Sequence, residues 1–508
     1  MMAGSLPAAV GFLAAVRPHG GSLPRPDFAS AGRRSELSEE TAGHSLRAVL
    51  LHPEAPDGAH ARDRGTTVIL AGELYNRDEL AGLLPAGSSP DSDAALVLAL
   101  FGLYDVHAFR LLNGRFSAFV TAGERVVLAT DHAGSVPLYV SAAAGQVLAA
   151  TEAKALRTAA GGQPLPARPV RRLAGVQQVP AGTVLDVRVS TADCVAHRTW
   201  APPLSRRIVS EHEAVETVRQ VLDRAVRVRM GTDTPLVVLS GGIDSSSVAA
   251  LSARRSAGRI DTVSMGTEEA DEFPQARVVA THLRSAHREV TVSTADLLRR
   301  MPHTVWAAES LDPDIVEYLL PLTALYLRLE GGGRRILTGY GADIPLGGMH
   351  REDRLPHLDT AVCHDMATFD GLNEMTPVLS QISGHWSTHP YWDRDVLDVL
   401  VALEAGLKRR YGQDKWVLRA AMGDLLPHEV VIRPKLGVHE GSGTTAAFTR
   451  LLVDAGVPHQ GVDRAKRMVV HDLFDHVVVA GRHPDEVKTE EVVEQVAERL
   501  ASGAPAAL

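Results

Sequence analysis

Apolar and polar positions divide this chain into two parts with different periodicities. From residue 1 to about residue 200, short apolar runs alternate with turns, a pattern that predicts many strands. An apolar run at residues 8–16 predicts a buried first strand, and residues 91–103 predict a helix because their apolar positions recur at helical spacing. Further strands are expected at residues 66–70, 116–121, 126–129, 146–150 and 182–189.

A second pattern begins at Ser210, where Ser210 and Glu213 form a possible capping box before an apolar stripe that predicts a helix to residue 228. Strands then alternate with helices, and the expected strands are residues 236–239, 260–265, 289–292 and 335–338. Such a rhythm is typical of a parallel, doubly wound sheet, whose ligands bind beyond the carboxyl ends of the strands. Residues 359–419 are expected to be mostly helical.

A proline-rich stretch at residues 201–204 separates the two patterns and predicts a linker. We therefore expect two domains, at residues 1–205 and 206–508.

The sequence Ser-Gly-Gly-Ile-Asp-Ser at residues 240–245 follows an apolar run and opens a helix-like segment. Glycines let the backbone approach a ligand closely, and the free N–H groups of a helix N-terminus favour an anion. Serine hydroxyls add donors, and Asp244 can hold Mg²⁺ on phosphates. No Gly-Lys-Ser/Thr follows, so this is not a Walker loop. The pattern indicates the pyrophosphate loop of enzymes that cleave ATP to AMP and pyrophosphate, although a bare Gly-Gly turn would be unremarkable before any helix.

Composition excludes several other classes of protein. The 508 residues carry a formal net charge of −9, which argues against nucleic acid or an anionic membrane as the main partner. Two cysteines, Cys194 and Cys363, make no disulfide framework or zinc site and suit a reducing cytosol, so a cytoplasmic location is expected. The N-terminus lacks a basic leader, and no stretch is long and apolar enough to span a membrane.

Several segments of the first half, in this order, resemble the glutamine amidotransferase domain of asparagine synthetases. They are Ala-Gly-Glu-Leu-Tyr-Asn at 71–76, Leu-Asn-Gly-Arg-Phe at 112–116, Asp-His at 131–132 with Pro-Leu-Tyr at 137–139, Thr-Glu-Ala-Lys-Ala-Leu at 151–156 and Val-Pro-Ala-Gly at 179–182. The resemblance implies an Ntn-hydrolase-like αββα sandwich. That family uses an N-terminal cysteine as nucleophile, whereas this chain begins Met-Met and has no cysteine before Cys194. We expect the scaffold to be kept and glutamine hydrolysis to be lost.

The second half resembles the synthetase domain of the same family, an α/β ATP-pyrophosphatase domain with helical additions. Asparagine synthetases carry Ser-Gly-Glu-Gly-Ala-Asp-Glu after a later strand, where this chain has Thr-Gly-Tyr-Gly-Ala-Asp-Ile at 338–344. Tyr340 therefore replaces a glutamate. Ammonia needs little help to lose a proton, whereas a more encumbered amine can need a base such as a tyrosine polarised by Glu374.

With Tyr340, the Glu374 segment at 370–375, Arg-Pro-Lys-Leu-Gly at 433–437 and Asp-Pro-Asp-Ile-Val-Glu-Tyr at 312–318, the chain resembles the β-lactam synthetases of clavulanic acid biosynthesis over nearly its whole length. This resemblance implies that ATP adenylates the β-amino acid carboxylate of N2-(2-carboxyethyl)-L-arginine. The secondary amine of the same molecule then closes the β-lactam ring, which gives deoxyguanidinoproclavaminate, AMP and pyrophosphate. It also implies a homodimer.

The resemblance assigns a role to each candidate residue. Tyr340 and Glu374 would deprotonate the amine, and Lys435 would stabilise the oxyanion and the departing AMP. Asp244 and Asp343 would hold Mg²⁺ on the triphosphate. The ATP site would comprise Leu239, Ser240, Gly241, Gly242, Asp244, Ser245, Met265 and Gly339, and the substrate site Tyr318, Tyr340, Gly341, Asp365 and Glu374, with Asp365 answering the guanidinium.

Several of these residues also have a simpler interpretation, without a role in catalysis or substrate binding. Tyr340 could pack on adenine, Glu374 and Asp365 could be ordinary surface carboxylates, and Lys435 could be a solvated lysine. His385 and His389 have helical i, i+4 spacing, but no glutamate adjoins His385, so we interpret them as structural rather than as zinc ligands. At the level of function, the alternatives are a carbapenam synthetase-like cyclisation of carboxymethylproline, an ammonia-dependent asparagine synthetase-like ligase, and an inactive nucleotide-binding scaffold.

Overall fold

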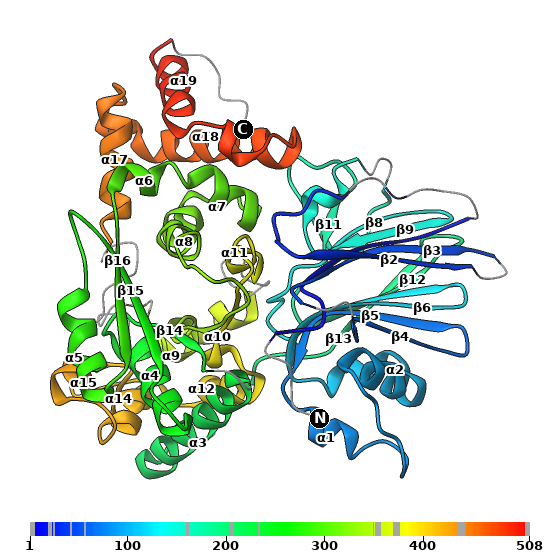
Figure 1. The fold of residues 1–508 in the computed structure, drawn as a ribbon, viewed down its shortest axis with the longest axis horizontal. Coiled ribbons are helices and arrows are strands. Elements are labelled where there is room, and N and C mark those ends of the chain that lie inside the picture. The colour runs from blue at the N-terminus through cyan, green and yellow to red at the C-terminus, as the bar shows by residue number, and fades with distance from the viewer. Residues whose placement is uncertain are drawn as a thin grey trace.

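The computed structural model describes residues 6–18, 23, 26–40, 43–54, 57–158, 162–203, 205, 208–231, 234–348, 350, 357–368, 376–434 and 442–502. Figure 1 shows a β-rich N-terminal part, coloured blue to cyan, beside a C-terminal part in which helices surround a smaller sheet.

Two antiparallel sheets form the N-terminal part. The seven-stranded sheet has the order β10 (Arg168–Pro169), β11 (Gln177–Gln178), β8 (Tyr139–Ala143), β9 (Gln146–Ala150), β1 (Gly11–Arg17), β3 (Ser45–His52) and β2 (Arg33–Glu40). The six-stranded sheet has the order β13 (Cys194–Arg198), β12 (Thr183–Arg188), β7 (Arg125–Thr130), β6 (Gly114–Ala122), β5 (Thr66–Leu74) and β4 (His60–Asp63). All strands expected in this half are confirmed, including the buried first strand, β1.

Successive side chains of β5 and β6 point to opposite faces of the six-stranded sheet and pack into two different apolar layers. Ile69 of β5 and Phe119 of β6 belong to the core that also takes in β1, β3, β8 and β9. Val68 of β5 and Val120 of β6 face the other way and pack with helix α2 (Asp93–Tyr104). Period-2 alternation therefore gives one face of the six-stranded sheet to the other sheet and the opposite face to helices, among them α1 (Arg77–Ala81).

A five-stranded parallel sheet forms the centre of the C-terminal part. Its order is β16 (Ala286–Val292), β15 (Asp261–Thr267), β14 (Leu236–Val238), β17 (Arg335–Leu337) and β18 (Trp386–Thr388), and every neighbouring pair is parallel. The chain proceeds outward from β14 to β16 and then returns to β17 on the other side of β14. The strand order thus reverses between β14 and β17, the position where sheets of this kind bind ligands.

Helices cover both faces of this sheet. Val237 and Leu337 pack with α3 (Glu211–Met230), α4 (Ile243–Arg255), α5 (Phe273–Leu283) and α14 (Trp416–Met422). Leu236 and Ile336 point to the opposite face and pack with α7 (Met301–Ala308), α8 (Pro313–Tyr326) and α11 (Val378–Gln381). The expected parallel, doubly wound α/β architecture is confirmed.

The remaining helices and short strands continue the C-terminal part. They are α6 (Thr294–Leu298), α9 (Asp343–Leu346), α10 (Leu358–Thr368), α12 (Arg394–Ala402), α13 (Ala405–Lys408), β19 (Arg409–Arg410), β20 (Gln413–Asp414), α15 (His428–Ile432), α17 (Thr444–Asp454), α18 (Val462–Phe474) and α19 (Thr489–Ala501). The described residues of the stretch 359–419 are mostly helical as expected, but they also contain β18. His385 and His389 flank that strand, so the helical spacing inferred for them is wrong: both lie on extended chain beside a strand.

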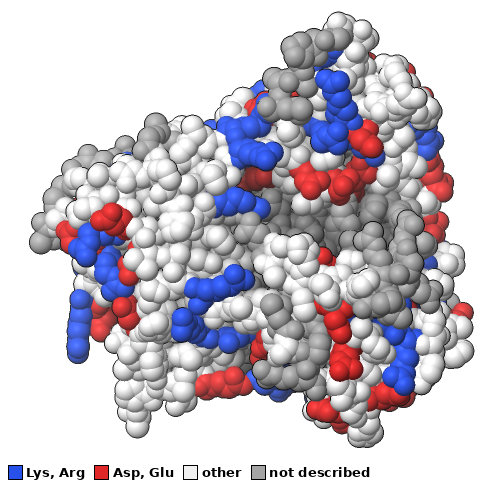
Figure 2. All heavy atoms as spheres, turned by 180° about the vertical axis from the view of Figure 1, so that it is seen from behind, with Lys and Arg blue, Asp and Glu red and all other residues white. Residues whose placement is uncertain are grey.

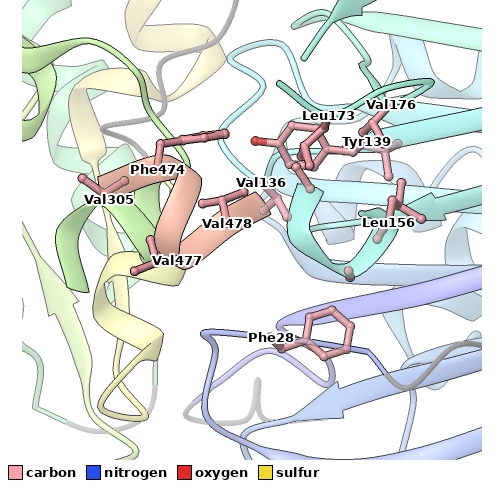
Figure 3. Packing of buried hydrophobic residues seen from close by; sticks show 14 of the residues in the cluster. Phe28, Val136, Tyr139, Leu156, Leu173, Val176, Val305, Phe474, Val477 and Val478 are labelled. Atoms are coloured by element: carbon pink, nitrogen blue, oxygen red, sulfur yellow. The ribbon is translucent and has the colours of Figure 1, made fainter. Parts of the chain in front are cut away.

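The two parts share a continuous apolar contact. Figure 3 shows Phe474, at the end of α18, and Val478, in the π-helix Asp475–Val479 that follows it, facing Tyr139, Leu173 and Val176 of the N-terminal part. Leu156 and Phe28 lie in the same cluster. A shared core of this kind fixes one part against the other.

The surface carries charges of both signs. On the face drawn in Figure 2, lysines and arginines lie in small groups near aspartates and glutamates. Within the described part of the chain, no helix has the length and apolarity needed to cross a bilayer.

Candidate active site at the switch point of the parallel sheet

Residues 240–242 form a tight turn between β14 and α4, as the sequence predicts. Gly241 has a φ of +77°, and a Cβ there would lie 2.5 Å from the backbone carbon of Gln275, so only glycine fits. The hydroxyls of Ser240 and Ser245 lie 3.1 Å apart, and Ser240 Oγ accepts from the Gly242 N–H at 3.3 Å. The turn presents backbone amides and hydroxyls at the N-terminus of a 13-residue helix, which is a setting for phosphate.

A second loop, residues 338–342, leaves β17 beside the first and leads to α9. Gly339 lies against the Ser240 turn, since a Cβ on it would be 2.3 Å from the Ser245 nitrogen. Gly341 has a φ of +92°, and a Cβ there would be 1.6 Å from the indole nitrogen of Trp392. Gly339 is therefore required for close packing of the two loops, and Gly341 for close packing of the second loop against Trp392.

Asp244 and Asp343 meet at one lysine that the sequence reasoning missed. Lys415 Nζ lies 2.5 Å from Asp244 Oδ2 and 2.7 Å from Asp343 Oδ1, and the lysine side chain has no exposed surface. Burial alone would lower the pKa of Lys415, but the two carboxylates outweigh burial and raise it, so the ammonium stays charged. Lys415 also has a left-handed φ of 51° between β20 and α14.

The convergence of Asp244 and Asp343 on one ammonium places their carboxylates within reach of a common cation. Carboxylate oxygens are the donors that Mg²⁺ prefers, so this pair fits that ion. Groups of three or more histidine, cysteine, aspartate or glutamate side chains that could hold a metal do not occur among the described residues. The remaining donors to a Mg²⁺ ion would come from phosphates and water.

Tyr340 lies between two other rings. Its ring centroid is 5.7 Å from that of Tyr318 on α8 and 5.3 Å from that of His389, both in edge-to-face geometry. The Tyr340 N–H donates to Thr338 Oγ1 at 3.2 Å. Tyr318 and Tyr340, two expected substrate residues, are thus brought together.

Other expected site residues lie along the same edge of the sheet or beside it. Leu239 is buried, and its N–H donates to the Val263 carbonyl of β15 at 2.8 Å, two residues before Met265. Asp365 lies on α10, where its Oδ2 is 2.7 Å from His350 Nε2. His350 is a second residue that the sequence reasoning missed.

Glu374 and Lys435 lie outside the described residues. The chain on either side of Lys435 reaches the candidate site, however. Arg433 donates to the Ser240 carbonyl at 3.5 Å and to Glu272 at 2.5 Å, and the Ser442 carbonyl accepts from Thr267 Oγ1 at 3.0 Å, at the end of β15.

Comparison with known proteins identifies the relatives of the chain. The asparagine synthase family matches residues 217–377 and 379–496, and the glutamine amidotransferase domain family matches residues 49–158. The carboxyethyl-arginine beta-lactam-synthase of Streptomyces clavuligerus is 61% identical over 508 residues, which cover 98% of this chain and 99% of that protein.

More distant relatives match a large part of the chain. A glutamine-hydrolysing asparagine synthetase of Asparagus officinalis is 24% identical over 429 residues, 78% of this chain and 69% of that one. Among solved structures, the allosteric regulatory enzyme of purine biosynthesis matches 56% of this chain and 75% of its own at 12% identity and a TM-score of 0.28, too low to support any argument. On the family match and the 61% identity, the chain belongs to the asparagine synthase family and, within it, to the β-lactam synthetases.

Proposed function

We propose that this protein is an ATP- and Mg²⁺-dependent β-lactam synthetase that cyclises N2-(2-carboxyethyl)-L-arginine. The observation that carries the proposal is the loop after β17, which brings Asp343 to Lys415 and Asp244 and carries Tyr340 where asparagine synthetases carry glutamate. The relative at 61% identity bears the name of this activity and supports the same substrate.

The first step is adenylation of the substrate carboxylate. The Ser240 turn would hold the phosphates through backbone N–H groups and hydroxyls, and Asp244 and Asp343 would hold Mg²⁺. Mg²⁺ bound there would neutralise charge on the triphosphate as pyrophosphate leaves. Lys415 places a further positive charge between the two carboxylates and keeps them from repelling each other.

The second step is ring closure. The secondary amine attacks the carbonyl carbon of the acyl-adenylate, so the new C–N bond forms and the C–O bond to AMP breaks. Tyr340 takes the amine proton while its own proton passes to Glu374. Both reacting groups belong to one bound molecule, which lowers the entropic barrier to a strained ring.

Two further assignments belong to this proposal. Lys435 is assigned to stabilise the oxyanion of the tetrahedral intermediate, and the hydrogen bond from Arg433, two residues earlier in the chain, to the Ser240 carbonyl supports this assignment. Asp365, with His350 beside it, receives the substrate guanidinium.

The N-terminal part is proposed to have lost glutamine hydrolysis. No cysteine precedes Cys194, and strand β1 begins at Gly11 after a buried segment whose Ala9 carbonyl accepts from the Gly72 N–H at 2.8 Å. Burial raises the pKa of Cys194 to about 11, and nearby Asp186 adds to the shift, so this thiol is a poor nucleophile. Glutamate release from glutamine, abolished by a thiol-blocking reagent, would refute this point.

We further propose a domain division at residues 205 and 206, a homodimer and a cytoplasmic location. Sedimentation of the purified protein tests the dimer, because a monomer at micromolar concentration would contradict it.

Product analysis with three substrates tests the proposed activity. With ATP and Mg²⁺, carboxyethylarginine should yield AMP, pyrophosphate and a product lighter by one water. Carboxymethylproline, or aspartate with ammonia, should yield none. Turnover of either in preference to carboxyethylarginine would favour the carbapenam synthetase-like or the asparagine synthetase-like alternative, and no AMP with any substrate would favour an inactive scaffold.

A further inference from the structure

His389 lies against the ring of Tyr340 and is fixed from its other side. The two ring centroids are 5.3 Å apart at an interplanar angle of 64°, and His389 is buried. His389 Nδ1 lies 2.6 Å from Thr338 Oγ1, the atom that also accepts from the Tyr340 N–H. One threonine hydroxyl thus ties the imidazole to the backbone of the tyrosine.

The strands that carry these residues are joined to each other. The Thr338 N–H donates to the Thr388 carbonyl at 3.2 Å, immediately beyond the paired ends of β17 and β18. Tyr340 follows β17 and His389 follows β18, so any sliding or spreading of this strand pair would change how the two rings meet.

Two side chains of the N-terminal part contact this strand pair. They are Glu73 of β5 and Tyr75, which follows β5. Glu73 receives two hydrogen bonds of 2.8 Å from Arg335 of β17 and one of 2.9 Å from the Trp386 indole of β18. The Tyr75 hydroxyl donates to Glu73 Oε1 at 3.0 Å and lies 2.9 Å from Thr388 Oγ1.

These contacts are charged and partly buried. Burial would raise the pKa of Glu73, but the Arg335 charge and the hydrogen bonds that Glu73 accepts together outweigh burial and lower it. Glu73 is therefore an anion that joins the two strands. Ionised, bidentate contacts of this kind fix geometry as well as binding strength. The glutaminase-like N-terminal part therefore holds in place β17 and β18, the strands that precede Tyr340 and His389.

We infer that His389 is a positioning residue for Tyr340, and that Glu73 and Tyr75 of the N-terminal part maintain that position through β17 and β18. The N-terminal part is then a component of the cyclisation site and not only a remnant. This inference rests on the proposed role of Tyr340 in taking the amine proton.

Three single substitutions test the chain of contacts. His389→Phe keeps a ring against Tyr340 but loses the bond to Thr338, Thr338→Val removes the shared hydroxyl, and Tyr75→Phe removes the hydroxyl from the N-terminal part. We expect lactam formation to fall about 10- to 100-fold in the first two and less in the third. Carboxyethylarginine-dependent ATP–pyrophosphate exchange should stay within about threefold of the parent rate in all three, because adenylation precedes the step in which Tyr340 acts.

Tyr139→Phe is the matched control for Tyr75→Phe. Tyr139 is also a buried tyrosine of the N-terminal part, and its hydroxyl also bonds across to a carboxylate of the C-terminal part, Glu309. Its substitution should leave the ratio of lactam formation to exchange unchanged. An equal change of that ratio in both tyrosine variants would contradict the inference, since it would then reflect contact between the two parts in general.

A double substitution separates this inference from the proposal on which it rests. If His389 acts through Tyr340, His389→Phe should lower lactam formation in the parent and have little further effect in Tyr340→Phe. Additive losses would overturn the inference while leaving Tyr340 as the base. Parent-like lactam formation by Tyr340→Phe would instead overturn the proposed function of that residue. Parallel loss of exchange and lactam in His389→Phe, with an unchanged melting temperature, would assign the histidine to ATP or substrate binding.

Discussion

Lys415 Nζ lies 2.5 Å from Asp244 Oδ2, although 171 residues separate the two in sequence. The same ammonium lies 2.7 Å from Asp343 Oδ1. A single buried charge therefore joins the loops that follow β14 and β17, the two strands between which the strand order of the sheet reverses. Two carboxylates this close would repel each other without a cation. Lys415 therefore preserves the shape of the site and adds a positive charge where phosphates are expected.

Lys415→Met should abolish pyrophosphate exchange and destabilise the protein. Removal of the buried partner of two carboxylates typically costs about 3–5 kcal/mol of unfolding free energy. Lys488→Met is the control, because Lys488 lies 2.6 Å from Glu491 but is exposed, and its loss should hardly change the free energy of unfolding. Equal midpoints of denaturant unfolding for the two variants would contradict the role of Lys415.

The raised pKa of Lys415 also sets a pH dependence. Its stabilising contribution is fully present below the ordinary lysine pKa and is lost only as the pH rises through the higher folded-state value. The stability difference between the parent and Lys415→Met should therefore not shrink as the pH rises from neutral to about pH 10. A difference that disappears within that range would show that the lysine is neutral there.

Asp244→Asn and Asp343→Asn should each prevent adenylation. Each change keeps the size of the side chain and removes a charge that we assign to Mg²⁺. We expect exchange to be lost at ordinary Mg²⁺ and partly recovered at high Mg²⁺, as measured by titration. A variant with parental turnover and an unchanged Mg²⁺ dependence would show that its aspartate is not a ligand.

Gly339→Ala should separate the two loops of the site. An added Cβ would lie 2.3 Å from the Ser245 nitrogen and 2.6 Å from the Asp244 carbonyl carbon, so one backbone has to move. A displacement of about 1 Å at a reacting centre can cost about 10²-fold in rate. Gly258→Ala, where no atom lies within 4 Å, is the control and should keep parental kcat. Parental activity in Gly339→Ala would mean that the loops are not held as closely as described.

Arg229 and Asp393 form a buried ion pair of 2.6 Å, with 2% and 5% of their side chains exposed, and Asn113 of the N-terminal part donates to the same aspartate at 3.0 Å. Arg229→Met leaves Asp393 buried and unpaired, at a cost of about 3–5 kcal/mol. Arg277→Met, which removes an exposed pair of 2.6 Å with Glu289, should cost far less. Indistinguishable unfolding midpoints would contradict this account of the interface.

The same pair predicts acid sensitivity. Burial would raise the pKa of Asp393, but the Arg229 charge and the hydrogen bonds from Arg229 and Asn113 together outweigh burial and lower that pKa. The stabilising contribution is present above the ordinary aspartate pKa and is lost as the pH falls through the folded-state value. The parent should therefore lose this contribution only below about pH 4, which acid unfolding of the parent would measure.

Local patterns were enough to predict the two loops and most strands. The Ser240 turn and the Gly339 loop each combine an apolar run, glycines and a polar side chain, and short strands such as β14 are visible as continuous apolar runs. The placement of Asp244 beside Asp343 followed from a general rule about the ends of parallel strands.

Lys415, His350 and β18 could not be found in that way. Lys415 stands between the short strand β20 and helix α14 in ordinary-looking sequence, and only its three-dimensional partners reveal its role. Strand β18 has only three residues, two of which, Ser387 and Thr388, are polar. It is too short to show the alternation of apolar and polar positions that marks a strand. The contact of Glu73 with Arg335 spans 262 residues and belongs to tertiary structure alone.

Tyr340→Phe, assayed for both half-reactions, tests the central claim most directly. The substitution removes the hydroxyl that we assign to the amine proton and keeps the ring between Tyr318 and His389. Lactam formation should fall by about 10²–10⁴-fold, as expected for a lost general base. Carboxyethylarginine-dependent pyrophosphate exchange should persist near the parental rate. Lactam formation at the parental rate, or loss of exchange in a protein with an unchanged melting temperature, would contradict the account.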